Sequence, residues 1–138
     1  MEFSLEEYDL TMLKRLLVIR ASREDKLRRQ LSQSQHASQR LAQEYVRVRA
    51  ERDELLAQLA QQVLPQESLS PDELLRFKLM LAKGYQHERA LAESLATLQS
   101  ETDELALTQE ELRANIVLLS KNQEKLKAVF DESSTSYR

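Results

Sequence analysis

Leucine recurs at every seventh position along the second half of the chain, and this repeat constrains the fold more than any other feature. It runs without a gap through Leu91, Leu98, Leu105, Leu112, Leu119 and Leu126. The companion positions, four residues after each leucine, are Leu95, Thr102, Gln109, Ile116, Gln123 and Phe130. Side chains spaced alternately four and three residues apart form one stripe on an α-helix, the seam of a left-handed coiled coil. The pattern predicts a long helix that packs against another helix.

The first half of the chain carries the same spacing with a weaker seam. Its apolar pairs are Leu13/Leu17, Leu27/Leu31, Leu41/Tyr45 and Leu55/Leu59. The pairs between them are Arg20/Glu24, Ser34/Ser38 and Val48/Arg52. We therefore expect every other layer of this helix to contribute little to the coiled coil, which favours a structure that can bend or accept a partner.

Capping signals divide the chain into two helices. Ser4 followed by Glu7, and Ser70 followed by Pro71 and Glu73, are both typical helix starts. Pro65 disfavours helix at the residue before it. We expect a first long helix over residues 4–63, a loop over 64–70, a second long helix over 71–130 and a flexible polar tail over 131–138. These segments predict an all-α fold. We expect one elongated domain in which the two long helices form an antiparallel coiled-coil hairpin.

A loop centred near residue 67 predicts which residues pair across this hairpin. Paired residue numbers should then add to about 134, which places Leu16–Ile19 level with Ile116–Leu119. The same register sets residues 10–52, with eleven basic and four acidic side chains, near residues 88–111, with seven acidic and one basic. We expect these charges to attract across the seam, each pair by a few tenths of a kcal/mol.

Composition argues against most catalytic and binding folds. The 138 residues include one Gly, two Pro and no Cys, and the formal net charge is −3. Sheets, phosphate loops and thiolate metal sites are therefore not expected, nor is a nucleic-acid partner. The two histidines, His36 and His87, are expected to lie too far apart to share a metal. We predict no enzyme activity, cofactor or metal, and a cytoplasmic protein without a secretory signal or membrane span.

Both ends of the predicted hairpin carry more apolar residues than one seam needs. At the termini they are Leu10, Met12, Leu13, Leu16, Leu17, Val18 and Ile19, together with Ile116, Val117, Leu118 and Leu119. Near the loop they are Leu74, Leu75, Phe77, Leu79, Met80, Leu81 and Tyr85. A two-helix seam buries one stripe per helix, so the surplus indicates partner surfaces. Near the loop, closure of the hairpin tip is an equally good explanation.

A cysteine-free chain of this size resembles the stalk proteins of type III secretion. It shares with them two long helices, a basic first helix and a Lys-rich stretch near the end. The resemblance covers the whole chain and is clearest over Ala114-Asn115-Ile116 through Glu124-Lys125-Leu126-Lys127-Ala128-Val129-Phe130. The family comprises the flagellar FliJ protein and its injectisome counterparts of the YscO and HrpO type. It implies a non-enzymatic cytoplasmic stalk at the base of the secretion apparatus, which couples a hexameric export ATPase to the export gate; some members handle secretion chaperones.

The resemblance also implies which residues meet which partner. The ATPase-facing set would be Leu13, Arg15, Leu16, Leu17, Ile19, Arg20, Leu118 and Lys121. The gate-facing set would be Phe77, Leu81 and Tyr85.

Two alternatives remain open on the sequence alone. One is a structural homodimeric adaptor without a secretion role, in which the repeat from Leu91 to Leu126 zips two chains in parallel. The other is a basic rod that binds RNA or a membrane. Its binding would weaken steeply as the salt concentration rises.

Overall fold

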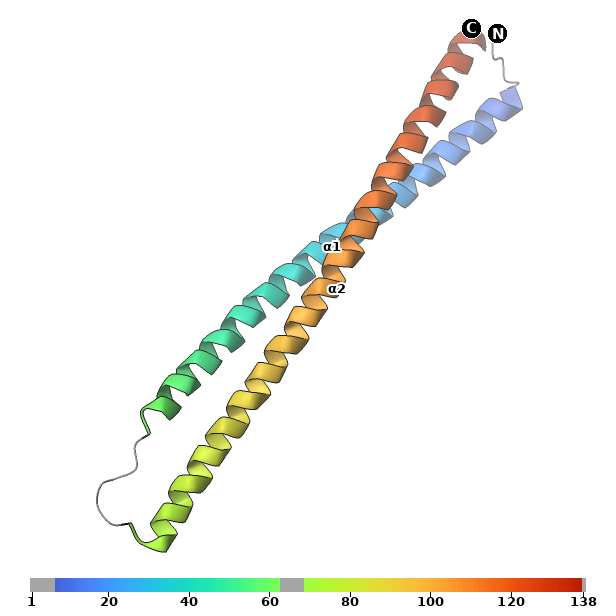
Figure 1. The fold of residues 1–138 in the computed structure, drawn as a ribbon. Coiled ribbons are helices and arrows are strands. Elements are labelled where there is room, and N and C mark those ends of the chain that lie inside the picture. Colours follow the sequence, from blue (N-terminus) through green and yellow to red (C-terminus); the bar gives the residue numbers. More distant parts are fainter. Residues whose placement is uncertain (1–6, 63–68, 138) are drawn as a thin grey trace. The chain divides into compact units, whose positions relative to one another are not determined.

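The fold is an all-α antiparallel coiled-coil hairpin of two long helices, as the leucine repeat predicts. The structure is a computed structural model that describes residues 7–62 and 69–137. Helix α1 spans Glu7–Ala60 and helix α2 spans Pro71–Tyr137 (Figure 1). The chain divides into two compact units, where sequence analysis expected one domain. Unit 1 comprises Met1–His36 and Leu105–Arg138, and unit 2 comprises Ala37–Glu104.

Ser70 caps the start of α2. Its Oγ accepts a hydrogen bond from the backbone N–H of Glu73 at 3.2 Å, and its carbonyl accepts one from the N–H of Leu74 at 3.0 Å. Pro71 occupies the first helical position, where a missing N–H costs nothing. The start predicted at residue 71 is thus confirmed with its cap. The matching cap predicted at Ser4 lies outside the described residues.

Replacing Ser70 with alanine should lower the free energy of unfolding by about 1 kcal/mol, because the N–H of Glu73 loses its acceptor. Urea denaturation followed by circular dichroism measures the loss. Ser100→Ala, at an exposed position within α2, is the matched control and should cost nothing. Equal stability of the two variants would contradict the capping role.

The ends of both helices differ from the predicted bounds. Helix α1 ends at Ala60, three residues before the expected stop. Helix α2 continues through residues 131–137, so the prediction of a flexible tail there is wrong. The polar residues of that stretch include neither Gly nor Pro. A polar sequence without these breakers can continue an existing helix, because Ser and Thr are only mildly unfavourable in helices.

Burial along both helices confirms the phase of the predicted seam. In α2, the seam positions from residue 84 to residue 133 are all buried or half-buried, at alternating spacings of four and three. In α1, the seven predicted pairs from Leu13/Leu17 to Leu55/Leu59 are buried or half-buried as well. The sequence repeat therefore identifies the contact stripe of each helix.

The core of unit 2 centres on a layer that was expected to be weak. Val48 is the most buried apolar residue described, at 4% exposure, and it packs with Leu91 and Leu95. Arg52, its companion in that layer, pairs through Nε with Glu88 Oε1 of α2 at 2.8 Å. The layer is strong because a small β-branched side chain fills the seam while the charge beside it has a partner across the helices.

Gly84 fixes the register of unit 2. It occupies a seam position of α2 opposite Leu59 of α1, and a Cβ placed on Gly84 would overlap the Leu59 Cδ2 methyl. A glycine within a helix costs about 1 kcal/mol relative to alanine. Here it provides the space into which Leu59 packs. Paired residue numbers in this unit therefore add to about 143, and not to 134.

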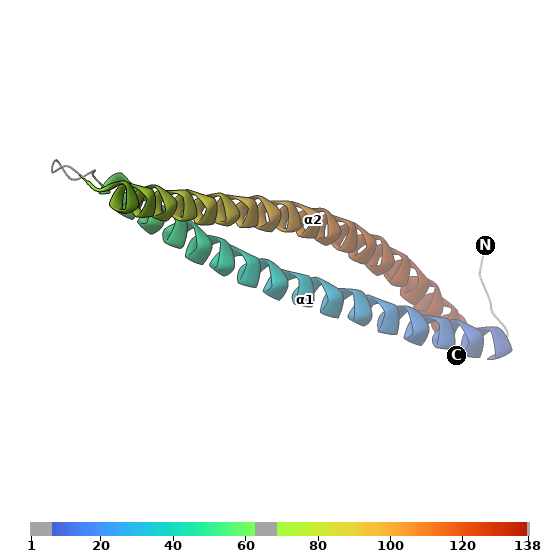
Figure 2. The same ribbon diagram turned by 90° about the horizontal axis from the view of Figure 1, so that it is seen from below.

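The register differs because the end of α1 and the start of α2 do not lie level with each other. Ala60, the last residue of α1, lies level with Lys83, so residues 71–82 of α2 extend beyond the end of α1. In Figure 1 the green end of α1 stops short of the yellow-green start of α2, and Figure 2 shows the same two segments as neighbours. The prediction centred the loop at residue 67, which assumed that the end of α1 and the start of α2 lie level. The predicted pairing was therefore misplaced by about nine residues.

One ion pair joins the two stretches that were expected to attract across the seam. It links Arg52 of α1 with Glu88 of α2, both in unit 2. The basic residues 14–29 belong to unit 1, whose α2 part, residues 105–138, carries five basic and five acidic side chains.

Replacing Gly84 with leucine should lower the free energy of unfolding by about 1 to 3 kcal/mol, because the new side chain overlaps Leu59. Combining it with Leu59→Ala exchanges the large and small members of the layer. The double variant should therefore lose less stability than the sum of the two single changes. Strictly additive losses in a thermal unfolding cycle would show that the two residues do not touch.

Unit 1 contains buried polar residues within its seam. Ser34 of α1 and Gln109 of α2 both occupy seam positions. Ser34 Oγ and Gln109 Nε2 are both buried, and neither has a hydrogen-bond partner in the part of the chain that the structure describes. Gln123 Oε1 has the same status further along the seam. Buried polar atoms without partners destabilise a core, so the weak layer predicted at Ser34 agrees with the structure.

Candidate functional site

The predicted ATPase-facing residues fall into two structural groups. Leu13, Leu17 and Arg20 are half-buried and occupy seam positions of α1. The other members of the set, Arg15, Leu16, Ile19, Leu118 and Lys121, are exposed. Only this second group is available to a partner without opening the hairpin.

The members of this set come from both helices of unit 1. Leu118 and Lys121 lie on α2, and the other members lie on α1. The position of Leu118 opposite Leu16 stays a prediction.

Two exposed apolar residues belong to this surface although the predicted set omits them. Val18 is 64% exposed, and Val117, beside Leu118, is half exposed. Val18 lines two hollows on the outward side of α1: one of about 430 Å³ with Lys14, Arg15 and Ile19, and one of about 830 Å³ with Arg28 and Arg29. The seam spacing could have identified Val18 as exposed, because a residue directly after the seam position Leu17 points away from α2.

Two of the three predicted gate-facing residues, Phe77 and Leu81, lie where α2 extends beyond α1, and Tyr85 lies just inside the overlap. Phe77 and Leu81 are half-buried and continue the seam spacing past the end of α1, whereas Tyr85 is 52% exposed on another side of the helix. Leu75 and Leu79 are exposed on these same turns. The result is an apolar surface that surrounds three turns of α2.

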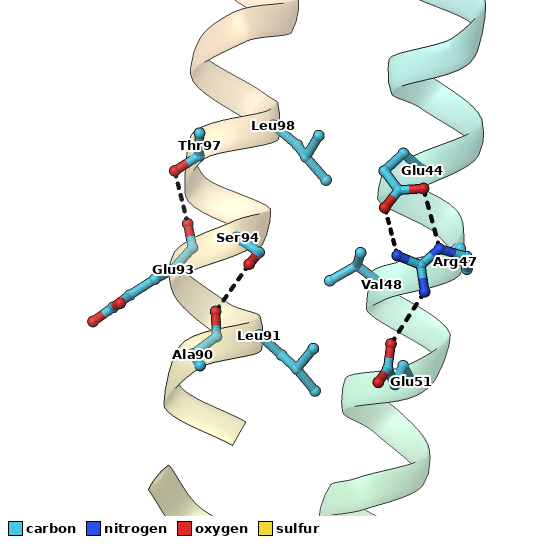
Figure 3. A pocket seen from close by; sticks show the side chains of 10 residues that line it. All are labelled: Glu44, Arg47, Val48, Glu51, Ala90, Leu91, Glu93, Ser94, Thr97 and Leu98. Atoms are coloured by element: carbon cyan, nitrogen blue, oxygen red, sulfur yellow. Dashed lines mark hydrogen bonds and ion pairs between the residues drawn. The ribbon is translucent and has the colours of Figure 1, made fainter. Parts of the chain in front are cut away.

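A groove between the helices of unit 2 is a site that sequence reasoning missed. It encloses about 640 Å³ and is lined by Glu44, Arg47, Val48, Glu51, Ala90, Leu91, Glu93, Ser94, Thr97 and Leu98. Figure 3 shows Val48 pointing toward Leu91 and Leu98, with Glu44, Arg47 and Glu51 together on α1 and Glu93 extending from α2 away from α1. Three carboxylates against one guanidinium make the groove acidic above an apolar floor. The sequence alone does not indicate this groove, because its lining combines two segments that are about fifty residues apart in the chain.

Arg47 lies between the two carboxylates on the α1 rim. Its Nε donates to Glu44 Oε2 at 3.1 Å, and its Nη1 donates to Glu51 Oε2 at 3.3 Å. The hydrogen bond and positive charge of Arg47 hold the pKa of Glu44 below its usual range, while Glu44 raises the pKa of Arg47. The two carboxylates and one guanidinium of this rim leave one formal negative charge in excess.

The Glu44 carboxyl should titrate below the ordinary glutamate range in an NMR pH series. Arg47→Gln should return its pKa toward the usual value, because the donor to the carboxylate is lost. Since the folded pKa is lowered, the ion pair contributes above the unfolded pKa, and its contribution is lost as pH falls through the folded pKa. Arg49→Gln, an exposed change on the same helix, should leave the titration unchanged, and a shift there would contradict this assignment.

Titratable residues elsewhere form no metal-binding group. His87 Nε2 lies 3.9 Å from Glu51 Oε1, a contact that is ionic only when the histidine is protonated. Within residues 7–62 and 69–137, no three His, Cys, Asp or Glu side chains are placed to hold a metal ion. Over the same residues, neither helix has a stretch long and apolar enough to cross a membrane. Comparison with family models, curated proteins and solved structures found no match.

Proposed function

We propose that this chain is a non-enzymatic coiled-coil stalk of a bacterial type III secretion system, which couples the hexameric export ATPase to the export gate. The observation that carries the proposal is the set of apolar side chains that the hairpin seam leaves exposed in unit 1. Among them, Ile19 is 51% and Leu118 is 60% exposed. A surface of this kind, bordered by Arg15 and Lys121, fits a protein partner. The whole-chain resemblance supplies the identity of that partner.

The exposure of each predicted residue suggests its part in the proposed contacts. Arg15, Leu16, Ile19, Leu118 and Lys121 would contact the ATPase, while Leu13, Leu17 and Arg20 would hold α1 in place beneath them. The first turns of α2, with Phe77, Leu81 and Tyr85, would contact the cytoplasmic domain of the gate. Secretion chaperones would be further partners, and the stalk would act in the cytoplasm at the base of the apparatus.

Copurification with the export ATPase of the same organism tests the proposal. Ile19→Glu combined with Leu118→Glu should reduce recovery of the ATPase about tenfold or more, because each change places a charge in an apolar contact. Leu107→Glu alters an equally exposed leucine of unit 1 outside the predicted set, and should keep the interaction. A wild-type chain that captures neither ATPase nor gate would refute the function.

The homodimeric adaptor requires a leucine repeat that is free to bind a second chain. In the hairpin, Leu91 and Leu95 are at most 9% exposed, and Leu98, Leu105, Leu112, Leu119 and Leu126 are half-buried. The repeat therefore already packs within one chain, and this fold favours the stalk over a parallel zipper.

A further inference from the structure

The groove of unit 2 has the chemistry of a receptor for a basic amphipathic helix. Its floor is apolar, with Val48, Leu91 and Leu98, and its rims carry Glu44 and Glu51 on α1 and Glu93 on α2. Among the residues that line the groove, Arg47 is the one cation, and it pairs with Glu44 and Glu51. A groove between two helices accepts a third helix that presents an apolar ridge to the floor and cations to the rims.

The outward side of α1 in unit 1 presents such a ridge. Val18 and Ile19 are the exposed apolar residues, and Lys14 and Arg15 stand one helical turn before them. Residues four apart lie on the same side of a helix, so Lys14 flanks Val18 and Arg15 flanks Ile19. Neither Lys14 nor Arg15 forms an ion pair within the part of the chain that the structure describes.

The two units differ in charge where these surfaces lie. Residues 14–29 carry an excess of five positive charges, and the α2 part of unit 1, residues 105–138, carries no net charge to offset it. The sequence of unit 2 carries twelve acidic and eight basic residues, an excess of four negative charges. Each surface therefore has the charge that the other requires.

We propose that the chain associates with a second copy of itself, the outward side of α1 in one copy docking into the unit 2 groove of the other. Val18 and Ile19 then cover the apolar floor, and Lys14 and Arg15 approach the rim carboxylates. The two surfaces differ, so the contact is heterologous, and every added copy presents a new groove or a new ridge. The assembly grows with concentration instead of stopping at a dimer. This inference does not rest on the secretion function.

Sedimentation velocity of the full chain, over a wide concentration range at low salt, tests the association. The wild-type mass should rise with concentration, and should fall back toward the monomer at about 0.5 M salt, where charges are screened beyond about 4 Å. Lys14→Glu with Arg15→Glu should weaken association at least about tenfold, because like charges then meet. Lys125→Glu combined with Lys127→Glu reverses the same amount of charge elsewhere in unit 1. This control pair should leave the association unchanged.

Charge exchange makes the test specific to these two surfaces. Glu44→Lys with Glu93→Lys creates a basic groove that should reject its own basic ridge. Mixing this variant with Lys14→Glu/Arg15→Glu should restore association, because each ridge then meets a groove of opposite charge. All these positions are exposed or half-buried on helix surfaces, so helicity should persist in circular dichroism spectra.

The native absence of cysteine allows a direct check of the contact. Val18→Cys mixed with Ala90→Cys should form a disulfide between copies under mild oxidation, faster than either variant alone. The proposal is overturned if the wild-type chain stays monomeric at all concentrations, or if the control pair Lys125→Glu/Lys127→Glu weakens association equally. It is also overturned if mixing the two charge-reversed variants does not restore association. Val18→Cys pairing only with itself would also overturn it.

Discussion

Leu95→Ala is expected to lower the free energy of unfolding by about 2 to 4 kcal/mol. Leu95 is 8% exposed and packs with Val48 and Leu91 in the core of unit 2. A two-helix hairpin has few other side chains that can move into the space left behind. The loss therefore combines the lost transfer free energy with an unfilled cavity, and Leu91→Ala should behave similarly.

Urea denaturation measures this loss, with two leucines of α2 as controls. Leu105 is a half-buried seam residue, so Leu105→Ala should cost less than Leu95→Ala. Leu107 is 62% exposed, and Leu107→Ala should change stability by no more than about 0.5 kcal/mol. Equal costs at Leu95 and Leu107 would refute the assignment of the seam.

The second large effect is a gain in stability. Ser34→Leu combined with Gln109→Leu should raise the free energy of unfolding by about 2 to 4 kcal/mol, because two buried polar groups without partners are replaced by apolar contact. The gain should appear in unit 1, which contains both residues. We expect the melting temperature of that unit to increase by about 10 °C.

Hydrogen exchange resolved by residue distinguishes a local gain from a general one. Amides of residues 105–116 should become better protected in the double variant, while those of residues 91–98 should change little. Ser32→Leu adds the same side chain at an exposed position of α1 and should give no protection. If the double variant is no more stable than the wild type, Ser34 and Gln109 do not share a layer.

The sequence was sufficient to predict the contact stripe of each helix, because the spacing of Leu91, Leu98 and their successors directly reflects helical geometry. The capped start at Ser70 was also predictable, since capping depends on adjacent residues. Both features are local, and local chemistry determines them.

The register could not be predicted in the same way. A heptad repeat allows any pairing that differs by seven residues, so the phase of the seam leaves the alignment open. The close packing of Leu59 on Gly84 selects one alignment, and that contact joins residues on different helices. The strength of the Val48 layer and the acidic groove depend on the same alignment.

The extension of α2 beyond α1 determines where this protein can tolerate changes in length. Residues 61–70 connect two helix ends that are about 18 Å apart along α2, and a ten-residue segment can extend to about 33 Å. The seam therefore holds the alignment without help from a tight turn, and doubling the linker would cost only about 0.6 kcal/mol. Insertions within either helix must come in sevens to keep the seam in phase. A peptide tag inserted into the linker should leave every layer of the hairpin unchanged.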